Sequence, residues 1–148
     1  MGSAGRHNDS MKKILVSLLL FGFICASAIS AHPRTRITSA FLQEAFEHLN
    51  DGYFDGNLPR DTRVIYGGPP DTEEVIGETY CTYVPQKGFS GCTIYIVPKY
   101  NLVAPIALES LNHEVCHIAT YGKDFNHGPV WQNCMLNLAK EGGFEGIW

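Results

Sequence analysis

Two histidines and a glutamate at helical spacing, His113, Glu114 and His117, are the residues of this chain best suited to chemistry. In a helix, side chains four positions apart lie one turn apart on the same face, so two imidazoles can bind one zinc ion. Glu114 then lies beside that face, where a carboxylate can take a proton from water and pass it to a leaving amine. The pattern H-E-x-x-H therefore predicts metal-assisted peptide hydrolysis with Glu114 as catalytic acid and base.

The flanking residues predict that this pattern lies in the second half of a helix from about Pro105 to Tyr121. Proline suits the first turn of a helix, and Gly122 follows the last apolar position, where a C-terminal cap is expected. A catalytic zinc ion usually has three protein ligands and an open position for water. His127 is the predicted third ligand, because the turn-rich stretch 122–126 is long enough for the chain to reverse.

The amino terminus has the pattern of a secretory signal. Residues 11–13 are Met-Lys-Lys, residues 14–24 form an almost uninterrupted apolar run, and residues 26–28 are the small residues that a signal peptidase accepts. We therefore predict a cleavable signal peptide at about residues 11–31, within an N-terminal segment 1–31. A retained membrane anchor is the alternative, although the apolar run is too short to span a bilayer comfortably.

The remaining residues, 32–148, are predicted to form one globular domain, since the chain has 148 residues and 45% of them are hydrophobic. Removing residues 1–31 takes away three of the 11 basic and one of the 15 acidic residues, which leaves eight basic, 14 acidic and a net charge of −6. This region has no cluster of Lys and Arg, so we expect no nucleic-acid partner. The signal predicts a secreted or periplasmic protein that meets a membrane only through its signal peptide.

Four cysteines follow the signal peptide, namely Cys81, Cys92, Cys116 and Cys134. An even number in an exported protein fits two disulfides. We favour pairing Cys81 with Cys92, which would close the loop between two predicted strands. The second pair, Cys116 with Cys134, would tie the metal-binding helix to the helix after it. The alternative is a thiolate zinc site, but no C-x-x-C spacing supports it.

Two further helices are predicted, one on each side of the central motif. Thr38 or Ser39 can cap a helix that ends at Asn50-Asp51-Gly52 and whose apolar residues form one buried stripe. His48 lies on its solvated face and is predicted to be a surface histidine. A last helix begins at Gly128-Pro129 and ends at Gly142-Gly143.

Short strands are predicted between the first helix and the motif. Residues 62–66 form one strand, and the alternating segments 75–83 and 92–97 form an antiparallel hairpin with a loop over 85–91. The predicted fold class is α+β, a small single domain with helices packed on a short, mostly antiparallel sheet.

The arrangement of these segments resembles the SprT-like family of zinc metallopeptidases, the group that includes Spartan. The likeness covers most of residues 32–148 and is strongest in its last two segments. The segments that carry it are LNDGYFDGNLP at 49–59, IGET at 76–79, IYIVP at 94–98, LNHEVCH at 111–117 and HGPVW at 127–131.

By this resemblance the zinc ligands are His113, His117 and His127, Glu114 is the catalytic acid and base, and the fold is a small zincin core of helices packed on a mixed sheet. The secretion signal and the acidic domain depart from the intracellular, DNA-linked work associated with Spartan. We therefore do not carry that biology over to this chain.

Other zinc-binding patterns fit less well. In metzincins the third histidine follows the second more closely, and the residue at that place here is Lys123, which cannot serve as a ligand. Glu141 and Asp124 are the alternative third ligands. Tyr80, Tyr100 and Tyr121 are candidates for binding the oxyanion, and their spacing does not select among them.

We predict a secreted or periplasmic zinc endopeptidase with a protein or peptide substrate, which a sheet edge near the metal helix would hold extended. One alternative is a zinc hydrolase acting on cell-wall peptides, which activity on purified cell wall but not on unfolded protein would identify. The other is a non-catalytic module in which zinc only ties two helices together. Such a structural site has no need of Glu114.

Overall fold

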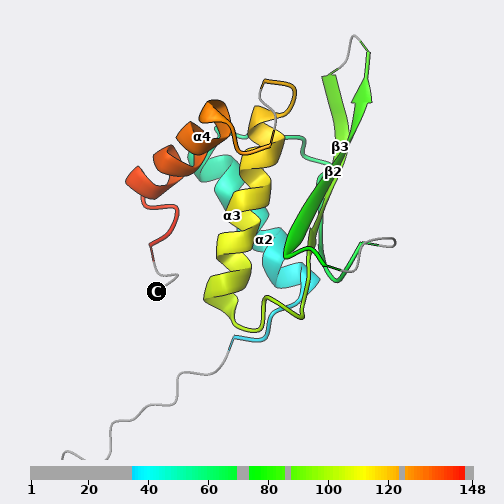
Figure 1. Cartoon of the computed structure of the whole chain (residues 1–148), viewed down its shortest axis with the longest axis vertical. Coiled ribbons are helices and arrows are strands. Elements are labelled where there is room, and N and C mark those ends of the chain that lie inside the picture. Colours follow the sequence, from blue (N-terminus) through cyan, green and yellow to red (C-terminus); the bar gives the residue numbers. More distant parts are fainter. Residues whose placement is uncertain (1–34, 70–73, 86–87, 124–125, 146–148) are drawn as a thin grey trace, which may run out of the picture. The chain divides into compact units, whose positions relative to one another are not determined.

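Three helices and a three-stranded sheet form the part of the chain described by the computed structural model, which covers residues 35–69, 74–85, 88–123 and 126–145. The α+β class is confirmed (Figure 1). The elements, in chain order, are α2 (Ser39–Tyr53), β1 (Arg63–Tyr66), β2 (Gly77–Val84), β3 (Gly88–Ile96), α3 (Ala104–Thr120) and α4 (Pro129–Lys140).

Some sequence-based predictions concern residues outside these ranges. They are the signal peptide at about residues 11–31, the domain boundary after residue 31, and Asp124 as an alternative ligand. Within the described ranges, none of the helices has the length and apolar character needed to span a membrane.

Helix α2 begins where the sequence predicts, because Thr38 caps it. The Thr38 hydroxyl accepts a hydrogen bond from the Phe41 amide at 3.1 Å. The helix continues past Asn50–Gly52, where it was expected to end. It ends at Tyr53, and the Asn50 side chain bonds to the backbone of Leu58, at 3.0 Å to the amide and 3.4 Å to the carbonyl. The inner face of α2 buries Leu42, Phe46 and Leu49.

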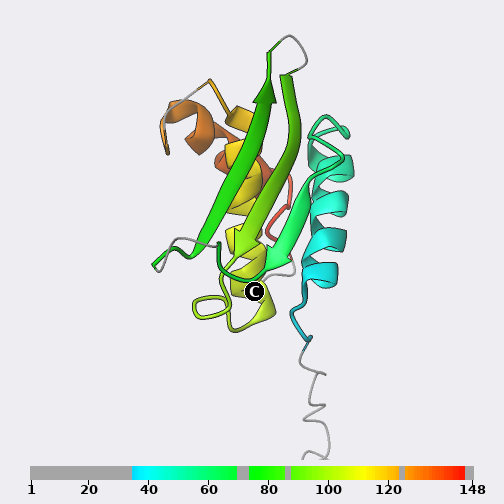
Figure 2. The same cartoon turned by 90° about the vertical axis from the view of Figure 1, so that its right-hand side faces the viewer.

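The sheet has the strand order β1-β3-β2, and Figure 2 shows it face on. Strand β3 pairs with β1 in parallel and with β2 in antiparallel orientation, so the sheet is mixed. Eight residue pairs are antiparallel and four are parallel, so the "mostly antiparallel" prediction is confirmed, whereas the parallel pairing of β1 with β3 was not predicted. Strand β2 lies at one edge of the sheet and packs against α3.

The hairpin is longer than the sequence predicts. A loop was expected over residues 85–91, but β3 already begins at Gly88. The register shifts after Cys81, which faces Cys92, because Gly91 is an extra residue on β3. Gly91 has φ +67, a conformation that glycine adopts readily and that is typical of a β-bulge. The glycine that suggested a loop is thus a bulge within a strand.

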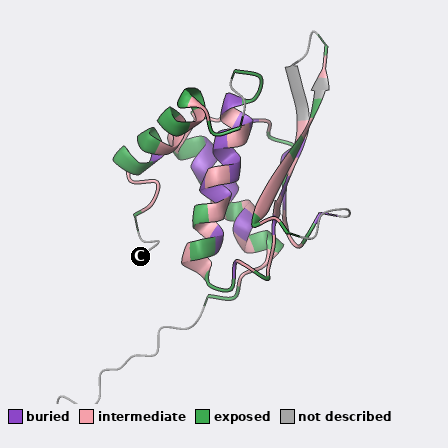
Figure 3. Ribbon diagram, in the orientation of Figure 1, coloured by how far each residue is buried: buried purple, intermediate pink, exposed green. Residues whose placement is uncertain are grey.

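The hydrophobic core lies between α2, α3 and the face of the sheet toward them. Figure 3 shows α3 as largely buried along its second half, whereas the outer side of α4 is exposed. Helix α3 has proline in its first turn and is followed by Gly122 with φ +73, close to the predicted bounds. The core residues are Leu42, Phe46, Leu49, Leu58, Val64, Cys92, Ile94, Ile96, Ala107, Leu111, Val115 and Ile118.

A fully buried side chain, Asn101, joins the sheet to the start of α3. Its amide group donates to the carbonyls of Ile76 and Val97, both at 2.9 Å. Its amide oxygen accepts from the Ser110 hydroxyl at 2.7 Å. Asn101 therefore connects the segments next to β2 and β3 with the helix that carries the histidine pair.

We expect Asn101→Ala to lower the free energy of unfolding by about 3 kcal/mol, because it leaves buried carbonyls and a hydroxyl without their partner. Urea denaturation measures the change. The matched control is Asn133→Ala on the exposed side of α4, which should stay within about 0.5 kcal/mol of the parent chain. Equal stability of the two variants would show that Asn101 does not join these elements.

Candidate metal centre

Helix α3 brings His113 and His117 together. The two residues are four positions apart, and their Nε2 atoms lie 3.2 Å from each other. Both side chains are partly buried. Helical periodicity alone accounts for this pair, as the sequence predicts.

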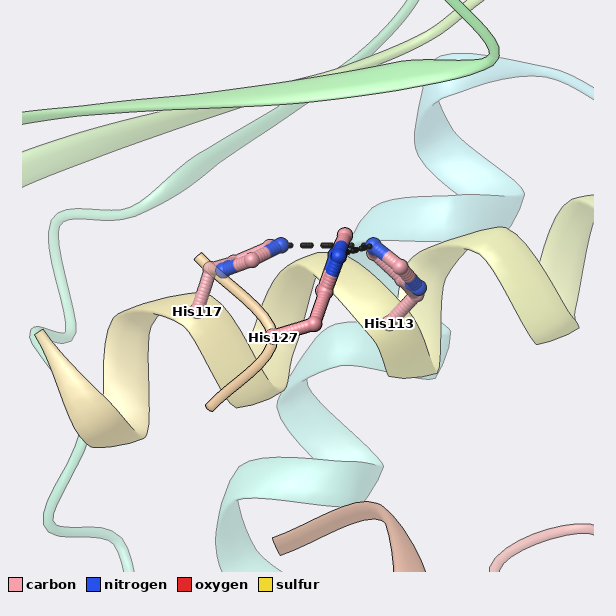
Figure 4. A group of neighbouring side chains, drawn as sticks. All are labelled: His113, His117 and His127. Atoms are coloured by element: carbon pink, nitrogen blue, oxygen red, sulfur yellow. Dashed lines mark hydrogen bonds between the residues drawn. The ribbon is translucent and has the colours of Figure 1, made fainter. Parts of the chain in front are cut away.

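His127 joins them from the segment between α3 and α4. Its Nε2 lies 2.9 Å from the Nε2 of His113, and Figure 4 shows the three rings turned toward one another. Just before it, Asn126 has φ 56, a left-handed conformation that asparagine tolerates and that helps the chain reverse. The ligand nitrogens of the three residues lie within 4.8 Å of one another, close enough to hold a metal ion.

The spacing of the three nitrogens suits a tetrahedral ion. Two nitrogens that each lie about 2.0–2.1 Å from such an ion are about 3.3 Å apart. The separations of 3.2 Å and 2.9 Å found here are close to that distance. Three imidazoles fit zinc but also other first-row divalent ions, so the donor set does not by itself select the metal.

The environment keeps two of the imidazoles neutral. Burial, with the charges that His117 and His127 carry when protonated, lowers the pKa of His113 to about 4. Burial and the His127 charge also lower the pKa of His117. Neutral imidazole is the form that binds a metal ion, so the protons are already absent at neutral pH.

Trp131 on α4 holds the three rings from one side. Its ring centroid lies 4.7 Å from that of His113, 5.6 Å from that of His117 and 4.3 Å from that of His127. Its indole N–H donates to the His113 carbonyl at 3.4 Å. Sequence reasoning included Trp131 in the segment HGPVW at 127–131 and assigned it no role.

Two further contacts fix the segment that carries the third candidate ligand, His127. The Gln132 side chain donates to the His127 carbonyl at 2.8 Å. The disulfide between Cys116 and Cys134 joins α3 to α4. Cys116 precedes His117, and Cys134 lies on α4, which follows His127. The disulfide therefore limits how far His127 can move from the histidine pair on α3.

The cysteine pairing that we favoured is confirmed, with Cys81–Cys92 between β2 and β3 and Cys116–Cys134 between the two helices. All four cysteines of the described segments are thus paired, and the alternative of a thiolate zinc site is wrong. Two disulfides point to an oxidising, extracellular environment.

Glu114 is 5% exposed and reaches from α3 toward β2. Its Oε2 accepts a hydrogen bond from the Thr79 hydroxyl at 2.7 Å. Burial raises the pKa of Glu114 to about 7; the Thr79 hydrogen bond opposes this rise and the Glu78 charge adds to it. Gly77 provides space, since a Cβ at that position would lie 3.0 Å from Oε1. Sequence reasoning assigned no role to Thr79 or Gly77.

The three histidines and Glu114 line one cavity of about 650 Å³. Its wall also includes Tyr121 and Lys123, whose ammonium donates to the Ala119 carbonyl at 3.3 Å. Of the three candidate tyrosines, Tyr121 lines this cavity, whereas Tyr80 packs on Tyr95 in the sheet. The cavity residues are Gly77, Glu78, Thr79, His113, Glu114, His117, Thr120, Tyr121, Gly122, Lys123, Asn126 and His127.

The alternative ligand Glu141 lies elsewhere. It follows the last turn of α4 as its C-cap and lines a separate cavity with Tyr53 and Val130. His48 is exposed on α2, as predicted. Among the described residues, the group that can hold a metal ion consists of His113, His117 and His127.

Comparison with known protein families, with curated proteins and with solved structures found no match for this chain. The likeness to SprT-like metallopeptidases therefore remains an inference from the sequence segments.

We expect the protein to bind one zinc ion per chain and His127→Ala to weaken this binding by at least about 100-fold, because losing a ligand costs more than losing an outer-shell partner. Competition with a fluorescent zinc chelator measures the affinity. The control His48→Ala removes an exposed histidine and should bind zinc like the parent chain. An unchanged affinity in His127→Ala would exclude it as a ligand.

In metal-free protein we expect Glu114 to make stability depend on pH. Its pKa rises from 4.5 in the unfolded chain to about 7 in the fold, so the folded chain holds the proton more tightly. Stability should therefore fall, relative to Glu114→Gln, as pH rises from about 4.5 to about 7, by about 3 kcal/mol in total. Protonation of His113 is expected to change the free energy of unfolding equally in the parent chain and in Glu114→Gln. Its effect therefore cancels when the two are compared.

Urea denaturation in the presence of a chelator, at about pH 5 and about pH 8, measures this difference. The control is Glu109→Gln, the same substitution at an exposed position of α3. A difference between parent and Glu114→Gln that does not change with pH would contradict the burial of an ionisable carboxyl group.

Proposed function

We propose that this chain is an exported, zinc-dependent endopeptidase. The observation that carries the proposal is the convergence of three imidazoles beside a buried carboxylate in one cavity. A metal ion that only ties helices together needs ligands but no carboxylate next to its open side. Glu114 on the cavity wall therefore favours a catalytic site.

Zinc is the proposed ion, because three neutral imidazoles and an open position are a common catalytic zinc site. When bound, zinc would supply a more acidic water and polarise the carbonyl of the substrate. The ligand atoms would be the Nε2 nitrogens of His113, His117 and His127. The Nε2 of His113 lies 3.2 Å from that of His117 and 2.9 Å from that of His127.

Glu114 moves the proton in the proposed reaction. It accepts a proton from the attacking water while the water oxygen bonds to the carbonyl carbon of the peptide. It then gives that proton to the amide nitrogen as the C–N bond breaks, so the products are a carboxylic acid and an amine. Burial raises the pKa of Glu114 in the metal-free protein, and a bound divalent cation would favour the ionised form that accepts the proton.

The substrate is proposed to bind as an extended chain beside β2. This strand pairs with β3 on one side, and in the described sheet it is an edge strand. Its residues Gly77 and Thr79 line the cavity next to Glu114. Main-chain hydrogen bonds to a strand edge would hold a peptide independently of most of its side chains.

Export is supported by the two disulfides and by the signal-like segment at residues 11–31. The resemblance to SprT-like zinc metallopeptidases and to the zincin core agrees with the proposed ligands and acid/base. The acidic domain gives no support for a nucleic-acid partner.

We expect Glu114→Gln to retain zinc and to lower the hydrolysis of casein by at least about 100-fold, because acid/base catalysis contributes about 10²–10⁴-fold. Zinc content is measured by mass spectrometry and cleavage by release of labelled peptides. Glu109→Gln, on an exposed part of the same helix, should cleave casein like the parent chain.

Hydrolysis of casein by Glu114→Gln at the rate of the parent chain would refute the role of Glu114 as catalytic acid and base. Purified cell wall belongs in the same panel of substrates, because activity there and not on casein would indicate a cell-wall peptide hydrolase. Bound zinc without activity on either substrate would indicate the non-catalytic module.

A further inference from the structure

The contact between Thr79 and Glu114 joins the edge strand to the metal-binding helix. Along β2, Gly77 and Thr79 lie next to Glu114 of α3. The Thr79 hydroxyl donates to Oε2 of Glu114 at 2.7 Å, the usual length of a strong O–H···O bond. A second contact, 3.4 Å to the Glu114 carbonyl, is much longer and weaker.

This contact distinguishes the two oxygens of Glu114. Oε2 receives the Thr79 hydroxyl, whereas Oε1 lies beside Gly77, where a Cβ would come within 3.0 Å of it. The absence of a side chain at Gly77 gives the carboxylate room, and the hydroxyl holds its orientation. A glutamate side chain has several rotatable bonds, so without such contacts it would populate several orientations.

Orientation matters for the proposed reaction, because a general base must lie within hydrogen-bond reach of the proton that it takes. Small misplacements of a reacting group cost large factors in rate. An oxygen that accepts the Thr79 hydrogen bond is the poorer candidate for the moving proton. The other oxygen remains for that task.

We propose that Thr79 is a positioning residue: it binds Oε2 of Glu114 and so assigns proton transfer to Oε1. This inference rests on the proposed peptidase function. It differs from a merely structural role, in which Thr79 would only stabilise the packing of β2 on α3.

The kinetic test compares Thr79→Val, which keeps the branched shape and removes the hydroxyl, with Thr79→Ser, which keeps the hydroxyl. We expect Thr79→Val to lower kcat for a peptide substrate about 10- to 100-fold with little change in KM. Thr79→Ser should recover most of kcat. Thr35→Val, the same change at an exposed position ahead of α2 and outside the cavity, should match the parent chain.

A second readout does not need activity. In metal-free protein, Thr79→Val should lower the urea midpoint when Glu114 is present and have a smaller effect in a Glu114→Ala background. Zinc content, measured by mass spectrometry, should stay at one ion per chain in the Thr79 variants. Additive effects on the midpoint would show that the two side chains are not coupled, and would overturn the inference.

The outcomes separate this inference from the proposed function. If the parent chain cleaves peptides, Glu114→Gln does not, and Thr79→Val and Thr79→Ser have equal kcat, the positioning role is refuted and the peptidase remains. If the parent chain is inactive or Glu114→Gln is fully active, the peptidase fails and the positioning role fails with it. A loss of kcat in Thr79→Val that Thr79→Ser restores, with the coupling in metal-free protein, supports the inference.

Discussion

The burial of α3 is the constraint on which the rest of the structure depends. One side of this helix fills the core with Leu111, Val115 and Ile118, and its other sides contact β2 and α4. The same helix carries two of the three clustered histidines and the buried Glu114. A surface helix could carry H-E-x-x-H equally well, but its imidazoles and carboxylate would remain fully hydrated.

Burial shifts the pKa of the two histidines and the pKa of Glu114 in opposite directions, and both shifts favour the neutral form. It lowers the pKa of His113 and His117 and raises that of Glu114, because removal from water disfavours each charged form. The site therefore favours neutral groups. Neutral imidazoles are ready to bind a cation, and a divalent cation beside Glu114 would in turn favour its ionised form. Metal binding at the three histidines would thus be coupled to the charge of Glu114.

The parts of the fold that follow from local signals could be predicted from the sequence. Caps and glycines gave the ends of the helices to within about two residues, and the i, i+4 spacing gave the histidine pair. Contacts between distant segments were predicted only where cysteines or metal-ligating histidines marked them, because periodicity shows which face a residue lies on and not what it faces. Thr79 is 35 positions from Glu114, and Gly91 has the conformation of a turn residue although it lies within a strand. The parallel β1–β3 pairing was missed for the same reason.

The third clustered histidine raises a separate problem, because His127 lies in a connection and not in a regular element. Ordering such a segment costs conformational entropy for every residue in it. The disulfide between Cys116 and Cys134 encloses a segment of 18 positions that contains both His117 and His127. Closing a loop of about this length lowers the entropy of the unfolded chain and so stabilises the fold by roughly 3 kcal/mol at room temperature. It also removes the thiol of Cys116, which lies between two clustered histidines in sequence and would otherwise compete for a metal ion. An oxidising compartment is therefore part of what assembles the three imidazoles, since without the disulfide the Trp131 and Gln132 contacts alone would have to hold His127 in place.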